Sequence, residues 1–158
     1  MIVERQAVRA IVITPEKEIL LLRIHPPEGG DSFWITPGGG LEPGESPEAG
    51  LRRELKEELG LERFTMGPLL WRRQHTFNWG DKRILQREQF HAVHLPRFQP
   101  RMSDAVESKT LDRFHWWPLA ELKRTSERLT PLSLARIVDE YLAKGAPPIL
   151  PEVEILVD

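Results

Sequence analysis

Cysteine is absent from the 158-residue chain. Disulfide bridges, thiolate catalysis and cysteine-based zinc or iron–sulfur sites are therefore excluded. No apolar run approaches the roughly 20 residues of a membrane-spanning helix. The first stretch, MIVERQAVRAIVIT, carries charges and lacks a signal-peptide cleavage pattern. We therefore expect a soluble, cytoplasmic protein without a membrane partner.

An excess of either charge sign is also lacking. The chain has 22 Lys and Arg against 24 Asp and Glu, which gives a formal net charge of −2. This balance argues against sequence-independent nucleic-acid binding as the main activity. Hydrophobic residues at 40% and charged residues at 29% are ordinary for a globular protein. The length fits a single domain over residues 1–158.

Strands are predicted wherever apolar and β-branched residues cluster between turn residues. These stretches are residues 5–14, 18–24, 32–36, 65–79, 82–95 and 113–117. The first two strands form a pair, and the fourth and fifth form a hairpin around Trp79-Gly80-Asp81. Glycine and proline predict irregular structure at 37–45 and a polar loop at 95–109. The tail, 146–158, is expected to be an extended segment or a strand.

Helix signals are clearest after the glycine-rich stretch. Ser46 is a good N-cap, Pro47 fits the first helical position, and Gly60 fits the left-handed residue at the end. An apolar seam at i, i+4 spacing faces the core and consists of Leu51, Leu55 and Leu59. A second helix is predicted from Pro118, and a third, capped by Thr130 and Pro131, ends at Gly145.

Strands and helices alternate without a strict βαβ order. The predicted fold class is therefore α/β, with a mixed sheet between helices in a layered sandwich. Trp116 and Trp117 are adjacent on one predicted strand, so a regular strand would turn one of them toward the core.

Three glutamates share one face of the first helix. Because each helical residue turns by about 100°, Glu58 lies about 40° to one side of Glu54 and Glu57 about 60° to the other. Like charges at this spacing destabilise a helix, and no lysines at i+4 offset them. One interpretation is a solvated acidic face. The other is a binding site for a hard cation.

Clustered carboxylates are the ligands that Mg²⁺ prefers, and Mn²⁺ accepts the same set. The preceding Gly38-Gly39-Gly40 allows backbone to approach a metal or a phosphate closely, since glycine has no Cβ. A cation between carboxylates and phosphates can activate water and neutralise charge on a leaving phosphate. The residues therefore indicate water attack on a phosphoanhydride.

Residues 39–61 resemble the signature of Nudix hydrolases at every fixed position. The pattern is a glycine, five residues, Glu, seven residues, Arg-Glu, an aliphatic residue, any residue, Glu-Glu, any residue, Gly and an aliphatic residue. The matching residues are Gly39, Glu45, Arg53, Glu54, Leu55, Glu57, Glu58, Gly60 and Leu61. Flanking segments, WITPGG before the box and WWPLAEL near the end, are also similar to the family.

The resemblance implies a Nudix-type α/β/α sandwich and hydrolysis of a nucleoside diphosphate linked to another moiety. It makes Glu54, Glu57 and Glu58 ligands of Mg²⁺ or Mn²⁺, with the Gly39 carbonyl as a further ligand. In the same way it implies that Glu45 and Arg53 form a charge pair between the loop and the helix. Similar proteins are often dimers, which leaves a homodimer open.

The catalytic base has three candidates. In similar enzymes it is either a glutamate of the box or one from a later loop. Glu54 is our choice within the box. Glu107, in the 95–109 loop, is the candidate outside it, and its alternative is a solvated loop residue. Glu88 is the third, and we expect it on a strand surface.

An aromatic stripe could bind a base. Trp71, His75, Phe77 and Trp79 share one strand face, and we favour Phe77 and Trp79 because they approach the hairpin end. Core packing is the alternative for each. Arg23, with Arg5 and Arg9, could reach phosphates, and surface charge is the alternative there. Gly38 and Gly39 complete the predicted substrate contacts.

Motifs typical of family subgroups are absent, including SQPWPFPxS, a coenzyme A signature and a tyrosine past the box, since Tyr141 is the only tyrosine. The substrate therefore stays open, with a nucleoside triphosphate or a modified nucleotide such as 8-oxo-dGTP among the choices. Two other functions also stay open. One is a non-catalytic nucleotide sensor, and the other is an RNA 5′-end pyrophosphohydrolase that would use Arg72, Arg73 and the basic stretch 97–101.

Overall fold

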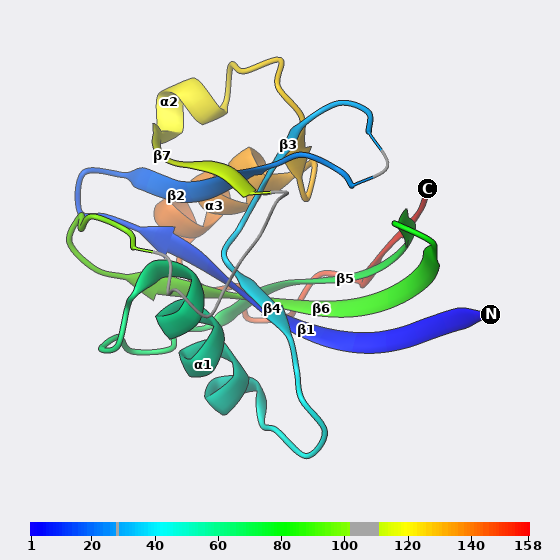
Figure 1. The fold of residues 1–158 in the computed structure, drawn as a ribbon. Coiled ribbons are helices and arrows are strands. Elements are labelled where there is room, and N and C mark those ends of the chain that lie inside the picture. Colours follow the sequence, from blue (N-terminus) through cyan, green and yellow to red (C-terminus); the bar gives the residue numbers. More distant parts are fainter. Residues whose placement is uncertain (28, 102–110) are drawn as a thin grey trace.

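The computed structural model describes residues 1–27, 29–101 and 111–158. Within these ranges nine strands form one mixed sheet (Figure 1) in the order β8-β3-β2-β1-β6-β5-β9, with β4 paired to β1 and β7 paired to β2. The strands are β1 (Ile2–Ile13), β2 (Glu18–Ile24), β3 (Phe33–Ile35), β4 (Gly38–Gly40), β5 (Leu69–Trp79), β6 (Lys82–His94), β7 (Leu111–Pro118), β8 (Leu129–Thr130) and β9 (Glu154–Val157). The helices are α1 (Pro47–Leu59), α2 (Leu119–Leu122) and α3 (Leu134–Lys144).

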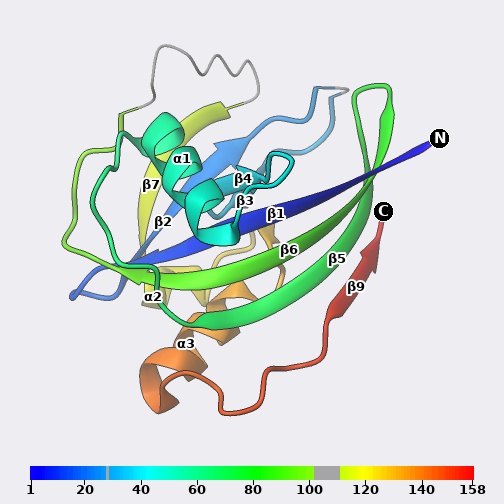
Figure 2. The ribbon, with the colours of Figure 1, turned by 90° about the horizontal axis from the view of Figure 1, so that it is seen from below.

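The helices cover both faces of the sheet. Figure 2 shows α1 on one side of β1 and β6, and α3 on the other side. This layering confirms the predicted α/β sandwich. Both predicted strand pairs are also present, with β1 antiparallel to β2 and β5 antiparallel to β6. The second hairpin turns at Gly80, whose φ of +62° suits glycine.

Helix α1 forms as its sequence predicts. The Ser46 hydroxyl accepts a hydrogen bond from the Ala49 N–H at 3.1 Å, and Pro47 occupies the first turn. Gly60 ends the helix with a φ of +72°, and its N–H donates to the Lys56 carbonyl at 3.0 Å. The seam of leucines at 51, 55 and 59 is fully buried. Packing of that seam turns the neighbouring acidic arc of the helix toward β4.

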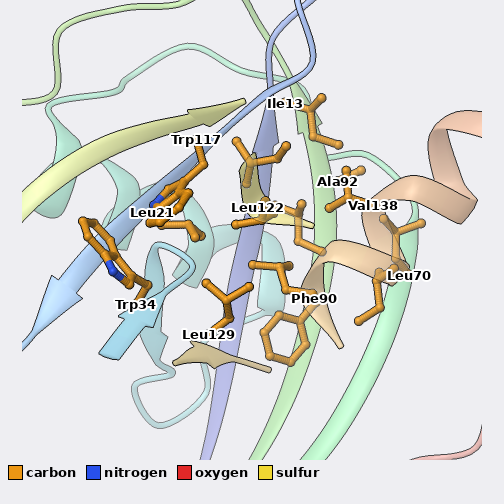
Figure 3. Close-up of a cluster of buried hydrophobic side chains, with 14 residues drawn as sticks. Ile13, Leu21, Trp34, Leu70, Phe90, Ala92, Trp117, Leu122, Leu129 and Val138 are labelled. Atoms are coloured by element: carbon orange, nitrogen blue, oxygen red, sulfur yellow. The ribbon is translucent and has the colours of Figure 1, made fainter. Parts of the chain in front are cut away.

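Alternating residues of the strands fill two separate cores. Ile11 of β1 and Leu21 of β2 belong to the core on the α3 side (Figure 3), whereas Val8 and Leu20 pack against α1. Trp117 lies in the first core and Trp116 in the second, so both are buried. The sequence predicted one of the two tryptophans to face the core, and the structure buries the other one as well, because helices cover both faces of this sheet.

Strand β4 lies in the glycine-rich stretch 37–45, where the sequence predicts irregular structure. Gly38, Gly39 and Gly40 pair antiparallel with β1, with Gly39 opposite Val8. Gly38 has a φ of +135°, and a Cβ there would lie 2.2 Å from the Val8 carbonyl oxygen. Only glycine permits this close approach, so the composition that suggested a loop is what allows the strand.

The predicted start of the third helix is also wrong. Thr130 belongs to β8, which pairs parallel with β3, and Ser133 is the N-cap residue of α3. A strand of two residues carries almost no periodic signal, so its pairing with β3 decides its conformation.

The tail resolves as a strand, one of its two predicted forms. Strand β9 pairs parallel with β5, which places Leu156 beside His75. The predicted extents of β1 and β5 differ from the observed ones by a few residues at their starts. Among the described residues, no helix combines the length and apolarity needed to cross a membrane.

Candidate active site

Strand β4 and helix α1 bring glycine backbone against the acidic face of the helix. The Gly38 N–H donates to Glu58 Oε1 at 2.9 Å. A Cβ at Gly39 would lie 2.6 Å from the Glu54 carboxyl carbon, so the bare backbone is what leaves room for this carboxylate. The structure thus places Gly38, Gly39, Glu54 and Glu58 together, as the sequence predicted.

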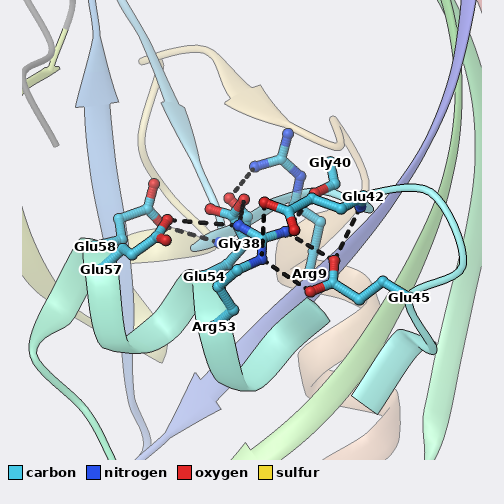
Figure 4. A network of polar contacts seen from close by, with 9 residues as sticks. All are labelled: Arg9, Gly38, Gly40, Glu42, Glu45, Arg53, Glu54, Glu57 and Glu58. Carbon is cyan, nitrogen blue, oxygen red and sulfur yellow. Dashed lines mark hydrogen bonds and ion pairs between the residues drawn. The ribbon is translucent and has the colours of Figure 1, made fainter. Parts of the chain in front are cut away.

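Arg53 organises the glutamates around it (Figure 4). Its Nε and Nη2 donate to the two carboxylate oxygens of Glu45 at 2.9 Å each, and Nη2 also donates to the Gly40 carbonyl at 2.9 Å. Its Nη1 lies 3.0 Å from Glu54 Oε1 and 3.5 Å from Glu57 Oε2. This geometry matches the predicted charge pair of Glu45 with Arg53. It also extends the pair, since the same guanidinium orients two further glutamates.

The glutamates of the site differ in their affinity for protons. The hydrogen bonds from Arg53 lower the pKa of Glu45 to about 2. Burial of its carboxyl group, together with the charges of Glu54 and Glu57, raises the pKa of Glu58 to about 7, although the Gly38 N–H and Arg9 lower it. A neighbouring positive charge would therefore favour the ionised form of Glu58.

The three helix carboxylates turn toward protein donors. Within residues 1–27, 29–101 and 111–158, no group of three His, Cys, Asp or Glu side chains is arranged as a metal site. The donor set nevertheless fits a hard divalent cation, because three carboxylates with different partners lie on one helical face beside glycine backbone. The residues therefore fit a hard divalent cation held between these carboxylates.

A cavity of about 640 Å³ opens beside this helix face. Gly38, Gly39 and Glu58 form one wall, and Phe77, Asn78 and Trp79 at the end of β5 form another. Such a volume accommodates a nucleotide-sized ligand. Of the metal-binding candidates, Glu58 and Gly39 therefore border the same space as the favoured aromatic residues, whereas Glu54 and Glu57 are not among its lining residues.

The floor of the cavity is one face of the central sheet. The register of β1, β6 and β5 aligns Arg5, Gln86 and His75 in one row across the strands, and Ala7, Glu88 and Arg73 in the next. His75 Nε2 lies 2.6 Å from Asp158 Oδ2. Although Asp158 favours the charged form, burial lowers the pKa of His75.

Glu88 lies inside this floor and not on the strand surface where we expected it. It is 2% exposed, and its carboxylate oxygens lie 3.1 Å from Arg9 Nε and 2.7 Å from Arg73 Nε. Burial alone would raise the pKa of Glu88, but the two arginines outweigh this effect and lower it. Both oxygens are thus engaged by cations, which argues against Glu88 as a catalytic base.

The remaining predicted residues divide. Phe77 and Trp79 line the cavity, whereas Trp71 packs against the α3-side core, and its indole N–H donates to Glu154. Arg23 is not among the described residues that line the cavity. It lies on β2, opposite Trp34 of β3 on one side and Arg113 of β7 on the other. Glu107 lies outside the described residues.

The prediction from sequence missed several polar residues of the cavity, and it considered Arg73 only for contact with RNA. Gln86 and Arg73 could have been found by following the alternation of β6 and β5 from Glu88, because all three face the same side. Asp158 carried no comparable signal, since its position depends on the pairing of β9 with β5.

A sequence model of the NUDIX domain matches residues 3–137. The chain belongs to the Nudix family. This match covers most of the chain and includes both the helix carboxylates and the cavity floor. Members of the family act on nucleoside diphosphate derivatives and generally depend on a divalent metal.

Solved structures with a similar fold come from several Nudix proteins. A MutT protein from Methanosarcina mazei is 19% identical with a TM-score of 0.62, and the match covers 89% of this chain and 94% of that one. A MutT Nudix hydrolase from Burkholderia pseudomallei is 26% identical with a TM-score of 0.58, covering 87% and 97%. The Nudix domain of Shewanella oneidensis NrtR, solved with ADP ribose, is 18% identical with a TM-score of 0.65, covering 89% of each. The fold is therefore that of Nudix hydrolases.

Two curated relatives match over shorter stretches. An octanoyltransferase from Myxococcus xanthus is 43% identical over 84 residues, which are 52% of this chain and 22% of the relative. The nucleoside triphosphatase NudI from an Enterobacter species is 63% identical over 27 residues, covering 17% of this chain and 19% of the relative. The chain thus spans about a fifth of the length of either relative.

Proposed function

We propose that this Nudix domain hydrolyses a phosphoanhydride bond in a nucleoside diphosphate linked to another moiety, with Mg²⁺ or Mn²⁺ as cofactor. The observation that carries the proposal is that Glu58 and the Gly38-Gly39 backbone form a wall of a nucleotide-sized cavity. Glu54 and Glu57 lie on the same helical face. The phosphoanhydride of a nucleotide bound in this cavity would therefore lie close to the carboxylates of α1.

Glu54, Glu57 and Glu58 would hold the cation, with the Gly39 carbonyl as a further ligand. When bound, the cation would supply charge neutralisation on the phosphates and activation of water. Arg53 keeps the loop and the helix in register, because one guanidinium bonds Glu45, the Gly40 carbonyl and Glu54. Its role is positioning, since its donors are directed at protein oxygens.

Glu54 is our proposal for the base that accepts a proton from water. It lies against Gly39 at the edge of the cavity wall and is oriented by Arg53 Nη1. Glu88 is disfavoured by its two arginine partners.

Arg5 is a candidate for contact with the phosphates. It lines the cavity next to Gly40, where a Cβ would lie 2.3 Å from its Nη2. It has no hydrogen bond or ion pair with the described residues. A guanidinium that forms no hydrogen bond within the described residues, at the carboxylate end of the cavity, suits the anionic chain of a nucleotide.

A substrate panel with Glu57→Gln and Glu48→Gln variants tests the proposal. ADP-ribose, diadenosine tetraphosphate, dihydroneopterin triphosphate, a UDP-linked sugar and 8-oxo-dGTP represent different anhydrides, and mass spectrometry identifies the products. We expect metal-dependent turnover of at least one of them. Glu57→Gln should reduce it at least about 100-fold, more than typical losses from outer-shell partners of a metal. Glu48→Gln, on the first turn of the same helix, should leave it unchanged.

Absence of turnover from a folded, metal-binding protein across this panel would contradict the hydrolase proposal. Tight nucleotide binding without any product would instead favour the non-catalytic sensor. Cleavage restricted to RNA 5′ ends, with binding that weakens steeply as salt rises, would favour the RNA enzyme. The homodimer and the cytoplasmic location stay predictions from the sequence.

A further inference from the structure

Gln86 occupies the middle of the cavity floor. It is 4% exposed and lines the cavity from β6, between Arg5 on one neighbouring strand and His75 on the other. Within the described part of the chain, no hydrogen bond engages its carboxamide. Buried amides are nearly always hydrogen-bonded, so a carboxamide in this state is open to a partner from outside the protein, either water or a ligand.

The groups around Gln86 are already engaged with one another. Glu88 is held by two arginines, and His75 is bonded to Asp158 with its ring 4.7 Å from the ring of Phe77. These contacts leave the amide donor and the carbonyl acceptor of Gln86 available to the cavity. A neutral carboxamide presents both side by side, which matches a ligand edge that carries an acceptor next to a donor.

Nucleobases carry such edges. Gln and Asn form paired hydrogen bonds with adenine through its N6 donor and N7 acceptor, for example. The cavity also supplies flat apolar side chains on which a base can stack, from Phe33, Phe77 and Trp79. Arg5 and Glu58 border the cavity on the side of β4 and α1, so phosphates directed toward them would leave the base above Gln86.

We propose that Gln86 is a specificity-determining residue whose carboxamide hydrogen-bonds the base of the bound nucleotide. This inference rests on the proposed nucleotide substrate. It goes beyond that proposal by assigning the choice of base to one side chain in the cavity floor.

Binding of nucleoside monophosphates tests the inference without any need for catalysis. The probes are AMP, GMP, CMP and UMP, with ribose 5-phosphate as the ligand that lacks a base, and affinities are measured by isothermal titration calorimetry with Mg²⁺ present. We expect the protein to bind at least one monophosphate about 10- to 100-fold more tightly than ribose 5-phosphate. Gln86→Met should reduce that preference to within about threefold, with the affinity for ribose 5-phosphate unchanged.

The matched control is Gln74→Met. Gln74 lies on β5 opposite Arg87, and it is absent from the cavity lining, so this variant should keep the preference. Circular dichroism and thermal unfolding establish that both variants are folded. Should Gln86→Met not fold, Gln86→Glu serves instead, because it keeps the size and the acceptor oxygens but loses the amide donor. It should lose the preference as well.

Two results would overturn the inference. One is a base preference that survives in the folded Gln86 variants, and the other is an intact protein that binds no monophosphate more tightly than ribose 5-phosphate. The hydrolysis panel is scored separately. Anhydride cleavage without a preference that depends on Gln86 refutes only this inference, and a preference that depends on Gln86 without cleavage refutes only the proposed reaction.

Discussion

Glu58→Gln should stabilise the metal-free protein, and the gain should depend on pH. Burial raises the pKa of Glu58 to about 7 from an ordinary value of 4.5. Between these values the folded state binds the proton more tightly than the unfolded state. The contribution of Glu58 to stability is therefore fully present below pH 4.5 and is lost as pH rises through 7.

The size of the effect follows from the difference between the two pKa values. A difference of 7 minus 4.5 corresponds to a free energy of roughly 3 kcal/mol at high pH. Glutamine mimics the protonated carboxyl group, since its carbonyl oxygen can still accept from the Gly38 N–H. We therefore expect equal stabilities below pH 4.5 and a variant more stable by up to about 3 kcal/mol at pH 8.5.

Urea unfolding in EDTA between pH 4 and 8.5 measures this difference. Glu57→Gln is the matched control, because the Glu57 side chain is 40% exposed and its neutralisation should change stability little. Parallel curves of stability against pH for the Glu58 variant and the unmodified protein would refute the reasoning from burial. Added Mg²⁺ should make the unmodified protein the more stable of the two at pH 8, because Mg²⁺ binds more tightly when the Glu58 carboxylate is present.

Three further changes probe the site. Gly39→Ala places a methyl group within 2.6 Å of the Glu54 carboxyl carbon and should lower kcat about 10-fold or more with little change in urea unfolding; unchanged kcat would show that the contact is unimportant. Arg53→Lys cannot bond Glu45, the Gly40 carbonyl and Glu54 together, so steady-state kinetics should show a loss of kcat of about 10- to 100-fold; a change confined to KM would contradict the positioning role. Glu88→Gln leaves two buried arginines without a counter-charge and should lower the free energy of unfolding by about 3 kcal/mol; a loss well under 1 kcal/mol in urea unfolding would argue against the pairing.

Local sequence determined what could be predicted well. Helix α1, its caps at Ser46 and Gly60, and its leucine seam depend on contacts within a few residues. The pairing of Glu45 with Arg53 likewise joins residues eight positions apart. The acidic face of α1 could be read from sequence for the same reason, because helical periodicity alone sets which side chains share it.

Long-range pairing determined what was missed. Strand β4 exists because Gly39 pairs with Val8 of β1, a contact that glycine composition alone does not reveal. The burial of Glu88 depends on Arg9 of β1, which lies beside β6 in the sheet but 79 residues away in the chain. That Glu88 and Gln86 share a face of β6 could be interpreted only once both faces of the sheet are known to be covered. Asp158 reaches the cavity only through parallel pairing of β9 with β5.

The ion-paired floor has a consequence for how a ligand binds. Glu88 ties β1 to β5 through Arg9 and Arg73, and Arg73 Nη1 donates to Thr130 of β8 at 2.6 Å. Four strands are thus fixed to one another before any ligand arrives. A ligand that settles on this surface meets side chains whose rotational freedom is already restricted, so binding costs little entropy in the protein. Affinity then depends mainly on how well the ligand complements a rigid cavity floor.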